Sequence, residues 1–349
     1  MRFYDAVADL SLTVEDYDLA RRSADTSSGF ERVTTVFELH GADETGRGED
    51  VTYDTEDHDA LHAAEDPFDL AGEYTFDEFS ALLDDTDLFP AKEPERETGY
   101  HYRRWGLESA ALDLALRQND TYLAAALGRE RDPVRFAVST RLGEPPSTDR
   151  VHDLLDAYPD SEFKLDPTSD WTDDIVADLA ALDRVRILDL KGQYHGTTVD
   201  QEADPDLYRR VVEGFPEAVI EDPALTDETE PVLADAHDRI SWDAPITGIE
   251  SIENLPFEPE VLNVKPSRFG TVESVLDSIA YCLDRDVRLY GGGQFELDCG
   301  RDHIQLLASV FYPDGPNDVA PSGYNDPEVQ SGLPTSPLTP GDEPAGLSF

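Results

Sequence analysis

The chain has 349 residues, and its 77 Asp and Glu residues against 27 Lys and Arg residues give a formal net charge of −50. So negative a surface does not neutralise phosphate groups, and we expect neither a nucleic-acid partner nor an anionic membrane partner. A hydrophobic content of 39% with 9% aromatic residues is enough for a packed core and argues against a disordered chain.

The first part of the chain predicts a small α+β domain over residues 1–130. Residues 32–39 (RVTTVFEL) read as a strand, and a glycine-punctuated turn, HGADETGRGED, leads to a second short strand, VTYD. Residues 106–127 (GLESAALDLALRQNDTYLAAAL) then place apolar side chains at helical spacing, which predicts a strong helix.

From residue 135 the pattern changes to short β-rich runs separated by helical stretches. Strands that alternate with helices predict parallel βαβ units. Seven or eight units in this length favour an α/β fold with a closed (β/α)7β TIM-type barrel over residues 131–315, and a doubly wound sheet is the alternative. Residues 316–349 are rich in Pro and Gly, and we expect them to pack back on the N-terminal domain. The runs are RFAVST, EFKLD, VRILDLKG, EAVIEDP, RISWDAP, EVLNVKPS and VRLYGGGQ.

Acidic side chains end three successive strands of the predicted barrel. Asp189, Glu221 and Asp243 would point into one mouth, where they repel one another unless a cation lies between them. Hard oxygen ligands of this kind fit Mg²⁺. For each carboxylate taken alone, the alternative is a helix N-cap or a turn residue.

Lysine is rare in this chain, and three of its four lysines fall at the same strand ends. Lys164, Lys191 and Lys265 flank the carboxylates, whereas Lys92 lies in the first domain. An amine beside a metal is a candidate for proton transfer, and a nearby cation and a dry barrel mouth would lower its pKa. A structural ion pair is the alternative, above all for Lys191.

The ordered set of strand-end residues, with an α+β domain before it, resembles the enolase superfamily on its muconate-lactonizing enzyme and mandelate racemase side. The segments that carry the resemblance are FKLD, ILDLKG, VIEDP, SWDAP, NVKPSRFG and GGGQFEL, together with ESAALDLAL and HGADETGRGED in the first domain.

The resemblance implies a fold and a chemistry. The first domain would be a capping domain, and Asp189, Glu221 and Asp243 would bind Mg²⁺, with Mn²⁺ as the alternative. Lys265 would remove the proton α to a substrate carboxylate, giving a metal-stabilised enediolate.

One departure from the family pattern bears on the reaction. The usual second-strand motif is Lys-x-Lys, but here Lys164 is followed by Leu165 and Asp166. The missing second lysine favours one-base β-elimination, as in a dehydratase or lyase. A cycloisomerase or epimerase, in which Lys191 compensates in part, is the alternative. A non-catalytic metal-binding relative is a third hypothesis.

Four residues are predicted to contact the substrate. Glu296 matches the acidic residue that follows the seventh strand in relatives, and Arg268 is expected to point to the same mouth and to pair with it. Gly292, in a triple-glycine run, offers a backbone N–H, and a tight turn without contact to substrate is the alternative. Arg22 lies in the N-terminal segment that caps the barrel in relatives, and an exposed surface position is the alternative.

The remaining expectations concern environment and assembly. The acid-rich, lysine-poor composition is typical of an extreme halophile, whose molar salt screens self-repulsion. The first residues lack a signal-peptide pattern and no stretch approaches about 18 apolar residues, which predicts a cytoplasmic protein. We expect a small carboxylate-containing substrate, and relatives imply a homo-oligomer. Cys282 and Cys299 are too few for a disulfide framework, and His195 and His303 are interpreted as structural.

Overall fold

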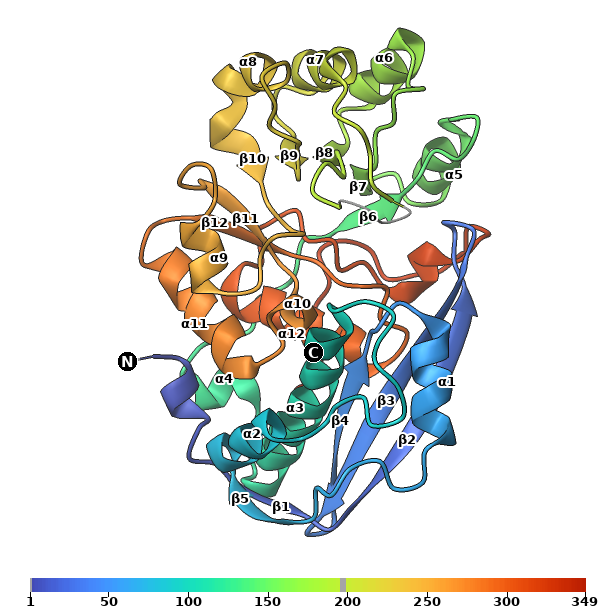
Figure 1. Cartoon of the computed structure of the whole chain (residues 1–349). Coiled ribbons are helices and arrows are strands. Elements are labelled where there is room, and N and C mark those ends of the chain that lie inside the picture. Colours follow the sequence, from blue (N-terminus) through green and yellow to red (C-terminus); the bar gives the residue numbers. More distant parts are fainter. Residues whose placement is uncertain (1, 195–198) are drawn as a thin grey trace.

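The computed structural model describes residues 2–194 and 199–349, so His195 lies outside the described residues. An N-terminal domain, blue and teal in Figure 1, packs against a barrel coloured green to orange. Within the described ranges, no helix is both long enough and apolar enough to cross a membrane.

The N-terminal domain consists of an antiparallel sheet and a layer of helices. Strands β2, β3 and β4 are hydrogen-bonded in that order, and a separate pair joins β1 to β5. Helix α3 packs on β4 and also contacts α10 and α11 of the barrel (Figure 1). The elements are η1 (Tyr4–Ala6), β1 (Ser11–Val14), β2 (Asp16–Asp25), β3 (Glu31–Gly41), β4 (Glu44–Asp50), α1 (Thr55–Ala63), β5 (Gly72–Thr75), α2 (Phe76–Asp84), α3 (Gly99–Gln118) and α4 (Leu123–Ala126).

Three details of this domain differ from the sequence-based prediction, and the first is that residues 51–54 (VTYD), expected as a short strand, form no strand. The segment expected as a turn is strand β4, and its glycines allow α3 to approach: a Cβ on Gly48 would lie 2.0 Å from the carbonyl oxygen of Gly106. The tight turn is confined to Ala42 and Asp43, both at positive φ. The helix predicted over residues 106–127 begins earlier and ends at Gln118, because Asp120 has a left-handed backbone that interrupts it before α4.

The second domain is the expected barrel of parallel strands. Strands β6 to β10 form one sheet in chain order, and β11 pairs with β12. The strands are β6 (Ala137–Thr140), β7 (Glu162–Leu165), β8 (Val185–Asp189), β9 (Val219–Glu221), β10 (Ile240–Ser241), β11 (Val261–Val264) and β12 (Arg288–Gly291). The helices that follow them are α5 (Asp149–Ala157), α6 (Asp173–Leu182), α7 (Pro205–Gly214), α8 (Glu230–Leu233), η2 (Ala234–Arg239), α9 (Ile249–Glu253), α10 (Pro266–Phe269), α11 (Val272–Leu283), α12 (Cys299–Phe311) and η3 (Ser322–Asn325).

Single backbone hydrogen bonds close the barrel on both sides of the β11–β12 pair. Asn263 donates to the carbonyl of Trp242 at 3.2 Å, which joins β11 to the segment after β10. Asp318 donates to Gly291 at 2.7 Å, and Ala137 donates to Asn317 at 2.8 Å. The short stretch 317–318 therefore fills the eighth strand position and completes the (β/α)7β arrangement, although it lies within the range 316–349 that the sequence pattern assigned to a C-terminal segment.

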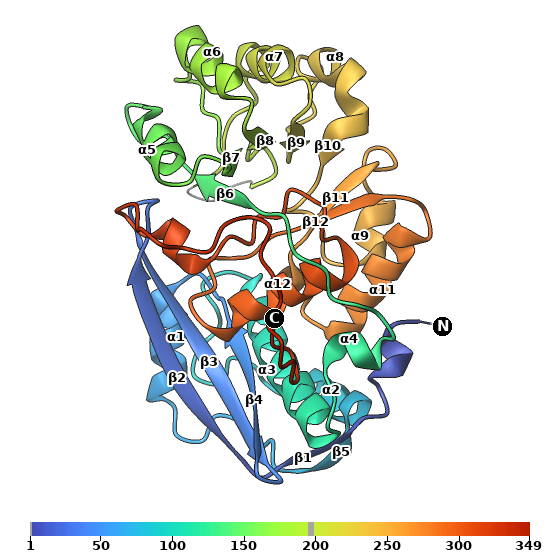
Figure 2. The same cartoon turned by 180° about the vertical axis from the view of Figure 1, so that it is seen from behind.

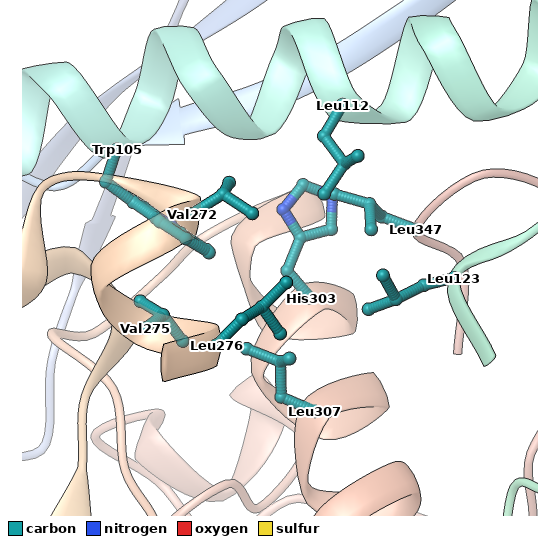
Figure 3. Close-up of a pocket in the computed structure, with 9 residues that line it drawn as sticks. All are labelled: Trp105, Leu112, Leu123, Val272, Val275, Leu276, His303, Leu307 and Leu347. Carbon is teal, nitrogen blue, oxygen red and sulfur yellow. The ribbon is translucent and has the colours of Figure 1, made fainter. Parts of the chain in front are cut away.

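Helices α3, α11 and α12 meet at a buried interface between the two domains (Figure 3). They enclose a small apolar cavity of about 20 Å³, beside which His303 lies almost fully buried. The C-terminal segment returns to this region (Figure 2), where Leu347 lines the cavity and its backbone N–H donates to Asp113 Oδ1 at 2.7 Å. The remaining lining residues are Trp105, Leu112, Leu123, Val272, Val275, Leu276 and Leu307.

Candidate metal centre and active site

Three carboxylates meet at the carboxyl ends of successive barrel strands. Asp189 ends β8, Glu221 ends β9, and Asp243 follows β10 by two residues. One oxygen of each lies within 4.8 Å of the other two, and all three side chains are fully buried. We call these residues the acidic triad. Neighbouring parallel strands deliver side chains to one edge, so residues far apart in sequence converge here.

Each member of the acidic triad contacts at least one of the three barrel lysines, Lys164, Lys191 and Lys265, and Asp189 contacts two of them. These ammonium groups offset part of the repulsion between the carboxylates. Lys164 lies between two of the triad carboxylates. The contacts are Lys164 Nζ to Glu221 Oε1 at 2.5 Å and to Asp189 Oδ2 at 3.3 Å, Lys191 Nζ to Asp189 Oδ2, and Lys265 Nζ to Asp243 Oδ2 at 2.7 Å.

The carboxylates of the triad have different pKa values. Burial opposes the ionisation of Asp189, but Lys191 and Lys164 outweigh it and lower the pKa of that carboxyl. Burial raises the pKa of Glu221 to about 8, with Asp189 adding to the effect and Lys164 opposing it. Glu221 is therefore the triad member whose protonation changes near neutral pH.

The pKa of Lys265 moves in the direction opposite to our expectation. Burial favours the neutral amine, but the carboxylate of Asp243 outweighs burial and raises the pKa of Lys265. The prediction of a lowered pKa assumed a cation beside the amine. In the structure the amine instead faces an anion at 2.7 Å.

Arg268 contacts the acidic triad and not Glu296. Its Nε donates to Asp243 Oδ1 at 2.8 Å, and its Nη2 donates to the hydroxyl of Tyr194 at 3.0 Å. The hydroxyl of Tyr194 donates to Asp243 Oδ2 at 2.8 Å. The predicted pairing of Arg268 with Glu296 is wrong, because the short helix α10 directs the guanidinium across the mouth toward Asp243.

Polar residues that the sequence-based prediction missed hold Glu221 in place. The Nδ2 of Asn263 donates to Glu221 Oε2 at 3.1 Å, and the hydroxyl of Tyr290 contacts the same oxygen and Ser241 Oγ. Asn263 precedes Lys265 by two residues. Since side chains alternate along a strand, this spacing was a signal that both face the same side.

Asp222 orients the third carboxylate of the triad. Its carboxylate accepts hydrogen bonds from the backbone N–H groups of Asp243 at 2.8 Å and Ala244 at 2.9 Å. Its own backbone is left-handed, with φ of 49°. Burial raises the pKa of Asp222 to about 7, and Asp243 and Asp189 add to the increase.

Asp166 and the three barrel lysines share a cavity of about 570 Å³. The Oδ2 of Asp166 accepts a hydrogen bond from Arg141 Nε at 3.0 Å, and its Oδ1 lies 3.9 Å from Lys191 Nζ. The N-terminal domain supplies part of the wall. The lining residues are Ser28, Phe30, Tyr53, Arg96, Thr98, Tyr102, Ser139, Thr140, Arg141, Lys164, Asp166, Lys191, Tyr194, Val199, Lys265, Arg268, Gly293, Gln294, Phe295 and Asp318.

Three of the predicted substrate contacts lie outside this lining. Arg22 donates from Nε to Asp298 at 2.6 Å, and Glu296 Oε1 accepts from the backbone N–H of Gln294 at 2.7 Å. Gly292 lies beside Lys265, where a Cβ would come within 2.8 Å of Lys265 Cε. Of the four predicted contacts, Arg268 alone is among the residues that line the cavity.

The donor chemistry of the acidic triad fits a divalent cation. Three carboxylate oxygens within 4.8 Å of one another match the preference of Mg²⁺ for a few carboxylates plus water or substrate oxygens. Asp189, Glu221 and Asp243 would hold the ion. Because the triad carboxylates also contact ammonium groups, a metal ion and the lysines would compete for these carboxylates.

Comparison with solved structures shows which fold this is. The chain resembles a member of the enolase superfamily from Listeria innocua, with 18% identity and a TM-score of 0.63 over 89% of this chain and 86% of that one. Muconate lactonizing enzyme from Pseudomonas putida has 18% identity and a TM-score of 0.63 over 88% of each chain. Dipeptide epimerase from Methylococcus capsulatus, solved with a Mg ion, has 17% identity and a TM-score of 0.65 over 86% of this chain and 88% of that one. The two-domain fold is that of the enolase superfamily.

Comparison of the sequence with family models gives two matches. The N-terminal domain of unknown function DUF8230 matches residues 5–126, and the C-terminal domain of unknown function DUF8230 matches residues 130–326. No curated protein matches the sequence.

Proposed function

We propose an enzymatic function for this chain, which belongs to the DUF8230 family: Mg²⁺-dependent removal of the proton α to a substrate carboxylate, followed by β-elimination. The observation that carries the proposal is that the acidic triad adjoins a cavity of about 570 Å³ through Lys164, Lys191 and Lys265, which line the cavity and contact the triad carboxylates. The substrate class is a carboxylate-containing small molecule, and we propose Mg²⁺ as the cofactor, with Mn²⁺ as the alternative.

The chain's own residues would divide the work. Asp189, Glu221 and Asp243 would bind the cation, which when bound supplies Lewis-acid stabilisation of the charge that develops on the substrate carboxylate. Lys265 would accept the α-proton. If Asp243 held a cation, Lys265 would lose part of the stabilisation that this carboxylate gives its ammonium form, which would favour the neutral amine that a base requires.

Asp166 supports elimination over two-base chemistry. Lys265 would take the α-proton as the C–H bond breaks, the C=C bond would form, and the same ammonium would return the proton to the departing β-hydroxyl, releasing water. This sequence needs one base on one face. Asp166, at the position of the family's second lysine, has no amine and is paired with Arg141.

A cycloisomerase or epimerase is the second candidate. Lys164 and Lys191 line the same cavity as Lys265, so further amines are available for a second proton transfer. The stereochemistry of exchange separates the two reactions. Loss of the α-proton from both epimers of a substrate would favour the isomerase.

The test is α-hydrogen exchange in D₂O with Mg²⁺ and molar KCl, over acid sugars, succinylbenzoate-type acids and dipeptides. The matched variants are Lys265→Ala and Lys92→Ala, because Lys92 pairs with Asp57 and Glu95 away from the cavity. We expect exchange with at least one compound, abolished in the first variant and retained in the second. Exchange that survives Lys265→Ala would contradict the proposal. Mg²⁺ binding without any exchange would favour a non-catalytic metal-binding protein.

The environment and assembly of the protein are proposed on composition and family resemblance. The charge of −50 with four lysines supports a halophilic source and a cytoplasm with molar salt. A homo-oligomer is proposed because the family resemblance implies one. Sedimentation in molar KCl measures the assembly directly.

A further inference from the structure

Phe295 has an unusual backbone conformation in the loop between β12 and α12. Its φ is 58°, and it is the single aromatic residue at positive φ among residues 2–194 and 199–349. The left-handed region is unfavourable for a bulky side chain, which crowds its own backbone there. Such conformations persist where surrounding contacts enforce them, and they cluster at ligand-binding sites.

Contacts from both domains enforce the conformation of this loop. Gln294, the residue before Phe295, is fixed through all its backbone polar groups: its N–H donates to Glu296 Oε1 at 2.7 Å, and its carbonyl accepts from Arg32 Nε at 3.1 Å. Its side-chain oxygen accepts from the hydroxyl of Tyr53 at 2.9 Å. The loop is therefore clamped immediately before the strained residue.

A buried carboxylate fixes the other side of the loop. Glu49, at the end of β4, accepts from the backbone N–H groups of Leu297 at 2.7 Å, Asp298 at 3.0 Å and Gly300 at 2.9 Å. The position of Phe295 thus depends on the N-terminal domain, although the residue belongs to the barrel.

The enforced conformation presents the ring of Phe295 to Phe30 of the N-terminal domain. Their centroids lie 5.5 Å apart at an interplanar angle of 81°, both side chains are partly exposed, and both line the cavity that contains Lys265. Tyr53 and Tyr102 line the same cavity and contact each other edge to face at 6.3 Å. We call these four residues the aromatic wall.

The cavity is larger than a small acid requires. Its volume of about 570 Å³ lies within the range of roughly 300–1,000 Å³ that drug-sized ligands occupy. Aromatic side chains bind flat apolar groups well, through area and through edge-to-face contacts. A substrate held only by its carboxylate at the triad would leave the aromatic wall uncovered.

We propose that Phe30 and Phe295 bind an aromatic or similarly flat apolar group of the substrate, and that the substrate is a carboxylic acid with this group away from its reacting carbon. This inference rests on the proposed function for the placement of the carboxylate at the acidic triad. It makes Phe295 a specificity-determining residue whose strained backbone aims its ring.

The test compares two non-reacting carboxylates, 4-phenylbutanoate and butanoate, by calorimetric titration in Mg²⁺ and molar KCl. We expect the phenyl compound to bind about 10- to 100-fold more tightly to the unaltered protein, the range that an apolar pocket provides. Phe295→Ala and Phe295→Gly should both remove most of this preference. The glycine variant is included because glycine adopts a positive φ without strain, so this variant is expected to fold. Phe3→Ala, which removes a partly buried ring outside the cavity, should keep the preference.

The outcomes separate this inference from the proposed reaction. Equal affinities, no binding of either compound, or a preference unchanged in both Phe295 variants would overturn the aromatic site. Exchange of α-protons together with equal affinities for the two compounds would support the proposed reaction and contradict the aromatic site. Tighter binding of the phenyl compound without any exchange would support the aromatic site and contradict the proposed reaction.

Discussion

The ammonium nitrogen of Lys265 lies 2.7 Å from one carboxylate oxygen of Asp243, while Arg268 Nε lies 2.8 Å from the other. One carboxylate of the acidic triad is thus shared between two cationic side chains. A divalent cation at the triad must compete with both. The guanidinium stays charged at every pH of interest, so its competition is permanent, whereas that of the amine depends on its protonation.

Replacement of Arg268 by Leu is therefore expected to tighten Mg²⁺ binding by about tenfold, because it removes a fixed positive charge from the site. Calorimetric titration with MgCl₂ measures the effect. Arg141→Leu is the matched control, since Arg141 pairs with Asp166 and not with the triad. Weaker Mg²⁺ binding in the Arg268 variant would mean that the arginine chiefly holds Asp243 in position.

Mg²⁺ affinity should also depend on pH through Glu221. Burial raises the pKa of this carboxyl to about 8, so a proton occupies it at lower pH and must leave when the metal binds. Affinity is then expected to fall by up to about tenfold for each pH unit below 8. Titrations at pH 6.0, 7.0 and 8.0 in two buffers of different ionisation enthalpy give the affinity and the number of protons released.

Glu221→Gln supplies the control for this pH dependence. The variant should bind Mg²⁺ more weakly at pH 8 and should lose most of the dependence between pH 6 and 8. An affinity of the unaltered protein that stays constant over this range would show that Glu221 is ionised throughout and would contradict the prediction.

The barrel and the acidic triad could be predicted from the sequence because both follow simple periodicities. Strands that alternate with helices produce one polar side chain per strand end, and Asp189, Glu221 and Asp243 recur with that rhythm. Lys164 and Lys265 could be identified against a background nearly free of lysine. The enclosing residues Tyr194 and Tyr290 had no such signal, since a tyrosine in or after a strand is ordinary core composition.

Other features depend on contacts between distant segments. Arg22 and Glu296 were predicted to face the substrate by position, but their partners Asp298 and Gln294 come from loop geometry that no local pattern encodes. The left-handed backbone of Phe295 is also invisible in the sequence, because Phe rarely adopts it. Sequence periodicity therefore located the acidic triad better than the residues that surround the cavity.

His303 should make the fold sensitive to mild acid. Its Nδ1 has no hydrogen-bond partner among the described residues, and burial lowers the pKa of the ring to about 4. In the unfolded chain the imidazole has a pKa of about 6.5, so below that pH it binds a proton in the unfolded state but not in the folded state. The free energy of unfolding is therefore unaffected by protonation of His303 above pH 6.5 and decreases as pH falls from 6.5 toward 4. Figure 3 shows the ring among Leu112, Leu347 and other apolar side chains.

Replacement of His303 by Leu is expected to remove this sensitivity. The measured quantity is the unfolding free energy of the variant minus that of the unaltered protein. This difference should be about 2 kcal/mol more favourable to the variant at pH 5 than at pH 7.5. Denaturant unfolding at the two pH values in 2 M KCl measures it. A difference that does not change with pH would show that the imidazole is protonated to the same extent in both states.

Salt should stabilise the fold strongly because of the net charge of −50. Self-repulsion between surface carboxylates acts over roughly 10 Å at 0.1 M salt and over about 3 Å at 1 M. We expect the thermal midpoint to rise by about 10 °C or more between 0.1 and 2 M KCl. An equal midpoint shift with sucrose at matched osmolality would attribute the effect to solvent exclusion instead of charge screening.

Gly292 is expected to control the position of the proposed base. A Cβ at this residue would lie 2.8 Å from Lys265 Cε and 3.0 Å from Asn263 Oδ1, so Ala there must displace the lysine side chain. The φ of Gly292 is outside the left-handed region, and the backbone accepts Ala without strain. Since the clash falls on a flexible side chain, Gly292→Ala should shift the thermal midpoint little but slow α-proton exchange at least about tenfold. Gly341→Ala, distant from the cavity, is the matched control. Unaltered exchange in Gly292→Ala would mean that Lys265 reaches its working position along another path.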